Sequence, residues 1–353
     1  MNRENPDVFD APVLVTGGTG FLGTHTVARL LADGYRVRTT VRSLDRTDEV
    51  LGALAKAGIP AQTVRERLEI VAADLGDDAG WPEAAAGCVY VLHVASPFYT
   101  VDPERAQELI GPARDGSLRV LRAARAAGVR RVVLTSSFAA VGYSPKPGHT
   151  YDESDWTDPD DSPSPYIKSK AIAEAAAWDF VRREGGGLEL TVINPTGIFG
   201  PALSPRLSSS MAMVKSMLEG TLTSMPRVYF GVVDVRDAAA VHVSAMTHPK
   251  AAGERILASS GEAISYRRLS EIIAERLGPR AGRLPIEEPS DEQVREAART
   301  VPALRDAASR LGIVPVIKTD KAREIFGWAP RDVADTLEDT AKSLLELIEP
   351  SAA

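Results

Sequence analysis

The sequence has few of the residues that stabilise secreted proteins or bind metals. Cys88 is the only cysteine among 353 residues, so no disulfide can form within the chain and a reducing compartment is expected. The five histidines show no metal-ligand spacing, and one cysteine cannot complete a zinc site. We therefore expect no metal and assign no function to a histidine.

Long apolar runs are also missing, and the chain starts with the polar segment MNRENPD. No stretch approaches the roughly 20 apolar residues that a membrane helix needs, and no secretory signal pattern is present. The formal net charge of −7, with basic residues interspersed among acids, argues against nucleic acid as a partner. The sequence thus predicts a cytoplasmic protein with neither membrane nor nucleic-acid contacts.

The strongest pattern lies at 11–42, APVLVTGGTGFLGTHTVARLLADGYRVRTTVR. A short apolar strand at 13–15 is followed by Gly17, Gly20 and Gly23, with Gly18 completing a G-x-G-x-x-G register. Such glycines allow a tight turn, backbone approach to a pyrophosphate and close helix packing. A helix over 21–32 and a strand over 35–41 complete a dinucleotide-binding unit, with the helix N-terminus facing the phosphates.

The end of the second strand indicates which dinucleotide is bound. An NAD site usually has Asp or Glu there, but this chain has Val41-Arg42. Arg42, with Arg38 or Arg46 as helpers, suits a 2′-phosphate. We therefore predict NADP(H) rather than NAD(H), the alternative being a solvated strand end.

Further strands are expected at 68–73, 89–95, 131–135 and 188–193. Asp74 follows one of them and suits either the adenine amino group or a helix N-cap. A long helical pattern covers 103–128, with Gly111-Pro112 as a candidate break. From Thr196 the elements become shorter, with strand 228–233 among them.

These elements predict an α/β fold, a Rossmann-type doubly wound parallel sheet with a smaller, mainly helical C-terminal portion for substrate binding. We place the NADP-binding domain at 1–195 and the substrate-binding portion at 196–353, with about 230–260 returning to the sheet.

Tyr166 and Lys170 stand four residues apart in a predicted helix, so their side chains share a face. Reduction of a carbonyl by hydride leaves an alkoxide that a tyrosine can protonate if its pKa falls. A neighbouring lysine ammonium would lower that pKa, and Ser137 at a strand end would orient the oxygen. The irregular segment 138–165, long and acidic, is placed to cover this site.

The chain resembles the extended short-chain dehydrogenase/reductase family through VTGGTGFLG, TSS, YIKSK, NPTGIFGP and KAREIFGW. TTVRS, AADL, HVASPF, YDESDW and AAAWDF are most similar to the branch of dihydroflavonol reductases, cinnamoyl-CoA reductases and microbial aldehyde or ketone reductases. The resemblance implies Ser137, Tyr166 and Lys170 as the catalytic triad and Arg42 on the 2′-phosphate. It further implies Asp74 and Leu75 near adenine, with Pro195 and Ile198 beside the nicotinamide.

The full set of expected cofactor contacts is Gly17, Gly20, Phe21, Leu22, Gly23, Arg42, Asp74, Leu75, Val94, Ala95, Ser96, Tyr166, Lys170, Pro195 and Ile198. Two departures concern the substrate. Gly142 stands where plant flavonoid reductases carry asparagine, and SPSPYIKSK lacks the Trp-Tyr-Cys-type motif of cinnamoyl-CoA reductases. We instead expect an apolar pocket of Ser96, Phe98, Phe138, Tyr143, Phe199, Met211 and Met213, each of which could equally be core.

The sequence therefore predicts an NADPH-dependent reductase of aldehydes or ketones that also runs in reverse as an alcohol dehydrogenase, acting as a monomer or homodimer on a small carbonyl or alcohol substrate. Two alternatives stay open. One is a nucleotide-sugar epimerase or dehydratase, which shares the fold and triad but usually prefers NAD. The other is a catalytically silent dinucleotide sensor that binds partners.

Overall fold

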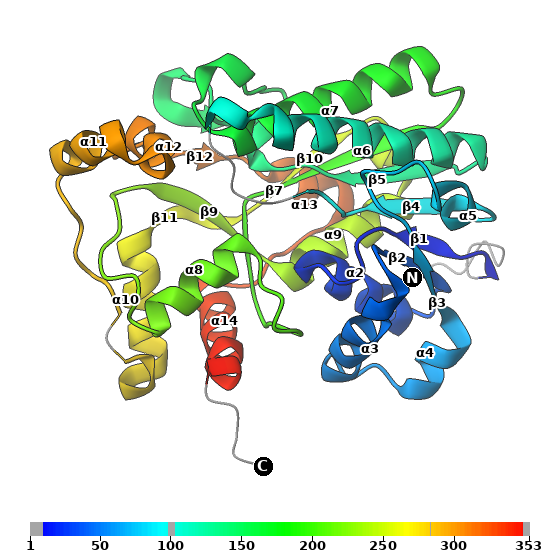
Figure 1. Ribbon diagram of the computed structural model, residues 1–353, viewed down its shortest axis with the longest axis horizontal. Helices are drawn as coiled ribbons and strands as arrows, with labels where there is room; N and C mark the ends of the chain where they lie inside the picture. The colour runs from blue at the N-terminus through cyan, green and yellow to red at the C-terminus, as the bar shows by residue number, and fades with distance from the viewer. Residues whose placement is uncertain (1–9, 98–102, 283, 349–353) are drawn as a thin grey trace.

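A parallel sheet forms the centre of the molecule (Figure 1). The computed structural model describes residues 10–97, 103–282 and 284–348. Within these residues the main sheet has seven strands in the order β10-β7-β5-β4-β1-β2-β3, and every neighbouring pair is parallel. The strands are β1 (Val13–Val15), β2 (Val37–Val41), β3 (Leu68–Ala72), β4 (Tyr90–His93), β5 (Arg131–Thr135), β7 (Glu189–Pro195) and β10 (Arg255–Ala258). The predicted Rossmann-type sheet is confirmed.

Helices cover both faces of this sheet, which explains why its strands lack polar alternation. In β1, Val13 and Val15 belong to one buried cluster while Leu14 belongs to the other. The first cluster includes α2 (Phe21–Ala32), α9 (Val235–Thr247) and α13 (Asp320–Phe326); the second includes α5 (Trp81–Ala85), α6 (Gln107–Ala126) and α7 (Pro165–Glu184). Figure 1 shows α6 and α7 above the sheet and α2 and α9 below it. Helices α3 (Thr47–Lys56) and α4 (Ala61–Arg67) lie between β2 and β3 in the chain.

The candidate break at Gly111-Pro112 is wrong, because α6 runs through Pro112 without interruption. Pro112 is only the sixth residue of this helix. Its missing amide therefore removes a single bond near the N-terminus, where helical bonds are few in any case.

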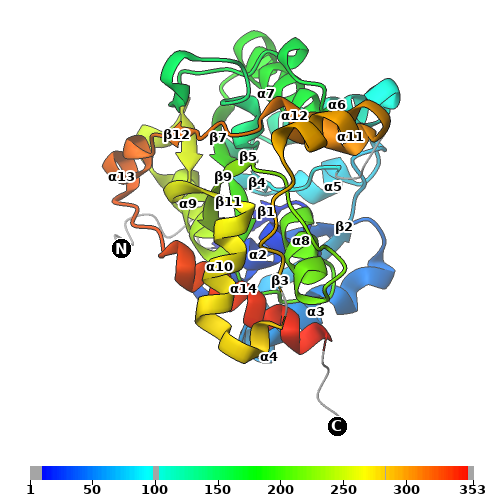
Figure 2. The same ribbon diagram turned by 90° about the vertical axis from the view of Figure 1, so that its left-hand side faces the viewer.

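The remaining elements surround a second, smaller sheet of order β11-β9-β8. Its strands and the helices packed on it are β8 (Gly197–Phe199), β9 (Tyr229–Asp234), β11 (Ser260–Ser265), α8 (Ser209–Leu218), α10 (Tyr266–Leu277) and α14 (Val333–Ile348). Figure 2 shows α8, α10 and α14 together, with α11 (Asp291–Thr300) and α12 (Arg305–Ser309) at the opposite end of this part.

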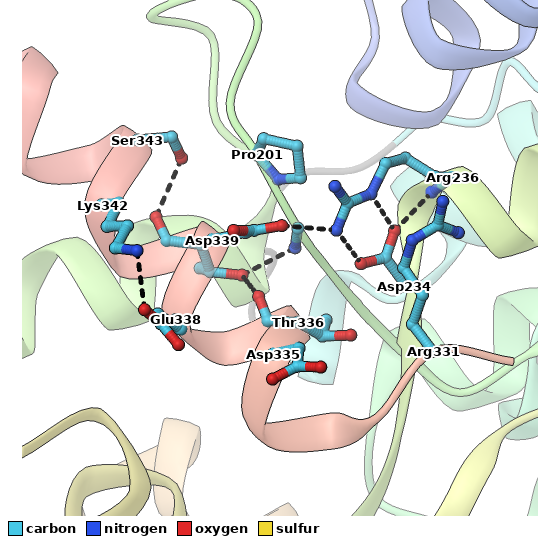
Figure 3. Close-up of polar contacts among 12 residues, drawn as sticks. Pro201, Asp234, Arg236, Arg331, Asp335, Thr336, Glu338, Asp339, Lys342 and Ser343 are labelled. Carbon is cyan, nitrogen blue, oxygen red and sulfur yellow. Dashed lines mark hydrogen bonds and ion pairs between the residues drawn. The ribbon is translucent and has the colours of Figure 1, made fainter. Parts of the chain in front are cut away.

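The C-terminal helix α14 is attached by polar contacts (Figure 3). Arg236 lies between Asp234 and Asp339, with Nη2–Oδ2 distances of 2.7 Å to both carboxylates. Thr340 Oγ1 accepts the Gly200 amide at 2.7 Å. These contacts fix the loop after β8, which borders the cavity described below.

A third, two-stranded parallel sheet joins two further segments of the chain. β12 (Val316–Ile317) pairs with β6 (Thr150–Tyr151), so the chain beyond α12 is joined to the irregular segment that precedes α7.

Candidate active site

One large cavity, of about 1070 Å³, runs along the carboxyl ends of the main strands. It reaches from the turn after β1 to the ends of β4, β5 and β7 and on to the second sheet. Strand order reverses between β1 and β4, and a crevice at such a reversal is the usual ligand site of an open parallel sheet.

The glycine turn after β1 is packed so closely that added side chains would collide with neighbouring atoms. Gly17 has φ +76°, a conformation that L side chains rarely adopt. A Cβ on Gly23 would lie 2.1 Å from the Gly17 carbonyl oxygen, and one on Gly18 would lie 2.4 Å from Thr39 Oγ1. The N-cap of α2, Gly20, offers no side-chain cap to the first helical amides. These amides and the bare turn suit a pyrophosphate.

Two arginines stand at the next part of the cavity wall. Arg42 and Arg46 both line it, and Arg46 also pairs with Glu49 at 2.8 Å. The prediction that Arg38 could assist Arg42 in binding the 2′-phosphate is wrong. Its guanidinium binds Glu69 and three carbonyl oxygens between β3 and β4 and does not line the cavity.

Asp74 lines the cavity and also accepts the Gly76 amide at 2.7 Å through Oδ1. The carboxylate therefore shapes its own turn. The helix N-cap alternative is wrong, because the N-cap of the next helix, α5, is Gly80.

A buried hydroxyl positions the end of β4. Thr16 Oγ1 accepts the amides of Val94 and Ala95 at 3.0 and 2.9 Å, so its proton points to His93 Nδ1 at 2.8 Å. Desolvation of the His93 ring, with a smaller contribution from the Lys170 charge, lowers its pKa to about 3. His93 is a neutral acceptor that fixes this strand end.

The predicted triad lies together on the cavity wall. Tyr166 Oη donates to Ser137 Oγ at 3.4 Å, and Lys170 Nζ donates to Ser96 Oγ at 3.1 Å. Pro165 starts α7 behind the N-cap Ser164, which fixes the helix one residue before the tyrosine.

The expected fall in the tyrosine pKa is not found. Burial raises the pKa of Tyr166 above its ordinary value, although the Ser137 hydrogen bond acts the other way. Burial also lowers the pKa of Lys170 to about 8, while Glu174 raises it. Lys170 does not lower the pKa of Tyr166 as expected, because its ammonium is directed to Ser96 and its nitrogen lies 5.9 Å from the centre of the Tyr166 ring.

A buried ion pair that the sequence analysis missed lies next to the triad. Glu174, one turn after Lys170, accepts from Ser136 Oγ at 2.5 Å, Asn194 Nδ2 at 2.7 Å and Arg255 Nε at 2.6 Å. Asn194 Nδ2 also donates to the carbonyl oxygen of Ser137 at 3.1 Å. The i, i+4, i+8 spacing of Tyr166, Lys170 and Glu174 on one helix face was the available signal.

The other end of the network reaches the acidic segment. Arg255 donates to the carbonyl oxygens of Glu153 and Ala140 at 2.9 and 3.3 Å and stacks over the Trp156 ring at 3.7 Å. The pair therefore ties α7 to β5, β7, β10 and the segment before α7.

Every expected cofactor contact lines the cavity, but the pocket prediction is wrong at one residue. Ser96, Phe138, Tyr143, Phe199 and Met213 line it. Met211 is wrong, because on α8 it turns away into the buried cluster with α10 and α14. Phe98 lies outside the described residues.

Sequence reasoning missed the far wall of the cavity. It is formed by residues of β9, α10 and α12 and the segment that follows, namely Tyr229, Phe230, Tyr266, Asp306 and Arg310. No motif marks these positions, since they come from separate segments. Among the residues that the structure describes, no cluster of His, Cys, Asp or Glu suits a metal ion, and no helix is both long and apolar enough to cross a membrane.

The comparisons with known proteins agree with this arrangement. Residues 13–258 match the model of the NAD dependent epimerase/dehydratase family. The chain is 37% identical to cinnamoyl-CoA reductase CAD2 of Medicago truncatula over 252 residues, which are 69% of this chain and 75% of that protein. It is 30% identical over 354 residues to the ketoreductase azaE of Aspergillus niger, covering 95% of this chain and 97% of that one.

Among solved structures, the yeast methylglyoxal/isovaleraldehyde reductase Gre2 complexed with NADPH is similar with a TM-score of 0.75 and 26% identity, covering 96% of this chain and 99% of that chain. The resemblance seen in the sequence motifs is confirmed. The chain belongs to the NAD dependent epimerase/dehydratase family, within the extended short-chain dehydrogenases/reductases.

Proposed function

We propose that this protein is an NADPH-dependent carbonyl reductase, which converts an aldehyde or ketone to an alcohol and also catalyses the reverse oxidation. The observation that carries the proposal is the position of the triad. Tyr166, Ser137 and Lys170 line the same cavity as the bare glycine turn and Arg42, so proton donor and dinucleotide site share one space. The similar proteins named above are reductases by name, and one was solved with NADPH.

The residues present fit the cofactor. The Gly17–Gly23 turn and the uncapped start of α2 would hold the pyrophosphate, and Arg42 would bind the 2′-phosphate through a charge-assisted bond. Asp74, Pro195 and Ile198 line the cavity; Asp74 would face adenine, and Pro195 and Ile198 would lie beside the nicotinamide. When bound, NADPH supplies a hydride to the carbonyl carbon.

The chain's own residues would handle the proton. Burial keeps Tyr166 protonated, because it raises the phenol pKa. Ser137 Oγ, 3.4 Å from the phenol oxygen, would hold the carbonyl oxygen beside it. As the new C–H bond forms, the electron pair of the C=O bond moves to oxygen, which takes the Tyr166 proton. Lys170, cationic at neutral pH with a pKa of about 8, would stabilise the resulting phenolate.

The test is consumption of NADPH with a panel of aldehydes, ketones and β-ketoesters, with NADH in parallel. Wild type should turn over with NADPH in preference to NADH. Tyr166→Phe should lower kcat by about 10²–10⁴-fold, the usual contribution of a general acid, and leave NADPH binding within about twofold, since the change removes a single hydroxyl.

Full activity of Tyr166→Phe would overturn the proton assignment. Tightly bound NAD in the purified protein, with no carbonyl reduction, would instead favour a nucleotide-sugar epimerase or dehydratase. Arg42 at the position where an NAD site has an acid speaks against that outcome.

A further inference from the structure

The far end of the cavity contains a cation that the chemistry above does not use. Arg310 follows the short helix α12 and lines the cavity with Tyr143, Phe230 and Tyr266. Its guanidinium carbon lies 4.8 Å from the centre of the Tyr143 ring. The centres of the Phe230 and Tyr266 rings are 4.8 Å apart, so the charge stands in an aromatic surrounding where ionic hydrogen bonds are stronger than in water.

Only some of the N–H donors of the Arg310 guanidinium are hydrogen-bonded within the protein. Nη2 donates to Asp306 Oδ2, while Nε is buried without a partner. Nη1 makes no hydrogen bond with any described residue and is not among the buried unpaired atoms. An arginine with a free Nη1 in an apolar cavity is well suited to bind a carboxylate or another acceptor oxygen.

The backbone turn after Arg310 is fixed by its own contacts. Gly312 has φ +73°, and a Cβ there would lie 2.8 Å from the Arg227 guanidinium. The Gly312 amide donates to the Arg227 carbonyl at 2.8 Å, and Arg227 pairs with Asp291 of α11 at 2.8 Å. The Arg310 guanidinium itself is held by Asp306 and lies over the Tyr143 ring, so it loses little freedom when it binds a ligand.

Other charged residues line the same cavity. Arg46 and Arg206 pair with Glu49, Lys170 donates to Ser96, and Asp161 and Asp306 are acids of the lining. Asp306 neutralises part of the Arg310 charge from one side, so it should weaken, but not cancel, the attraction for a second carboxylate.

On this basis, and resting on the proposed function, we infer that the preferred substrates are carbonyl compounds that carry a carboxylate, bound by Arg310, at the end of the molecule remote from the reacting carbonyl. The Tyr143, Phe230 and Tyr266 rings would contact the apolar part between the two groups.

The test compares acids with their methyl esters: 4-oxopentanoate, 4-oxo-4-phenylbutanoate and 4-formylbenzoate, each as the acid and as the ester. The readout is the acid-to-ester ratio of kcat/KM, together with calorimetric binding of each compound to the NADP⁺ complex. Wild type should favour the acid for at least one pair. Arg310→Met should lower that ratio by about tenfold to a hundredfold, the usual effect of losing a hydrogen bond to a charged group.

Asp306→Asn provides a change in the opposite direction, because it removes the competing negative charge and should raise the ratio. Arg305→Met is the matched control, since Arg305 belongs to the same helix but is exposed and does not line the cavity. An unchanged ratio in both cavity variants would overturn the inference. Arg310-dependent binding of the acids without any turnover would support it while contradicting the reductase proposal.

Discussion

The two ends of the cavity are built in different ways. At the glycine turn the surface is backbone: Gly17, Gly20 and Gly23 leave the helix amides of α2 uncovered, and Cβ atoms added to Gly20 or Gly23 would meet the Gly17 carbonyl oxygen. At the far end the surface is side chain, contributed by β9, α10 and α12. Substitutions at the backbone surface of the cofactor end would collide with the main chain, whereas residues of the side-chain surface can be replaced one at a time. The fold therefore constrains the cofactor site and allows the substrate site to differ in sequence.

The largest effect is expected at Glu174, in the buried network next to the triad. Glu174→Gln would leave the Arg255 guanidinium buried without its counter-ion, which should cost about 3–5 kcal/mol of unfolding free energy. It should also lower the pKa of Lys170 further, because Glu174 raises it. If cationic Lys170 is required, the activity of wild type should fall as the pH rises through about 8, and in the variant this fall should move to lower pH.

Denaturant unfolding and a pH profile of kcat measure these two effects. Glu174→Asp keeps the charge and should restore the pH profile more than the stability. A Glu174→Gln protein with unchanged stability and an unshifted pH profile would show that Glu174 neither stabilises the fold nor raises the pKa of Lys170.

The next largest effect should come from Gly23→Ala, which tests whether the cofactor end depends on bare backbone. The new methyl would lie 2.1 Å from the Gly17 oxygen, so α2 must move away from the turn. Overpacking of this kind costs about 1–3 kcal/mol, and NADPH binding should weaken by about tenfold or more. Fluorescence titration of NADPH measures the binding.

Gly52→Ala is the matched control, because Gly52 lies on α3 with nothing within 4 Å of an added Cβ. That change should leave NADPH binding unaltered and stabilise the chain by at most about 1 kcal/mol. Equal NADPH affinity in the Gly23→Ala protein would contradict the backbone account of the site.

The same contrast explains what could be predicted from the sequence. The cofactor end follows from contiguous segments, since a strand, a glycine turn, a helix and Arg42 lie within about thirty residues and each has a local physical meaning. Tyr166 and Lys170 were recognisable for the same reason.

The far wall was not recognisable, because Phe230, Tyr266 and Arg310 come from separate segments that meet only through tertiary packing. Met211 illustrates the limit: helical spacing cannot say whether Met211 or Met213 on α8 faces the cavity. The raised pKa of Tyr166 also required the fold, since neither the burial of the phenol nor the direction of the Lys170 ammonium follows from their spacing.

A graded effect is expected from acid on the cofactor end, where His93 and His25 are buried, with His242 beneath β5. Burial lowers the pKa of His93 to about 3 and those of His25 and His242 to about 4. The unfolded chain therefore binds protons below about pH 6.5 that the folded chain does not. Stability should fall between about pH 6.5 and 4, by up to about 1.4 kcal/mol per pH unit for each ring.

Urea unfolding at several pH values between 7.5 and 4.5 measures this slope. His93→Gln keeps an acceptor for the Thr16 hydroxyl and should reduce the slope by one proton. A stability that does not change over this pH range would show that the rings ionise in place.

The smallest effect should be found at the side-chain end, with Met213→Leu. Met213 lines the cavity, whereas Met211, two residues earlier on α8, is fully buried in the core. Swaps between methionine and leucine usually cost less than about 1.5 kcal/mol. Met213→Leu should therefore change kcat/KM between substrates by less than about tenfold and leave both the melting temperature and NADPH binding unaltered. Met211→Leu should do the reverse, changing the melting temperature but not the substrate ranking. If Met213→Leu instead weakened NADPH binding, the two ends would be coupled through α8 and the substrate end could not vary independently of the cofactor site.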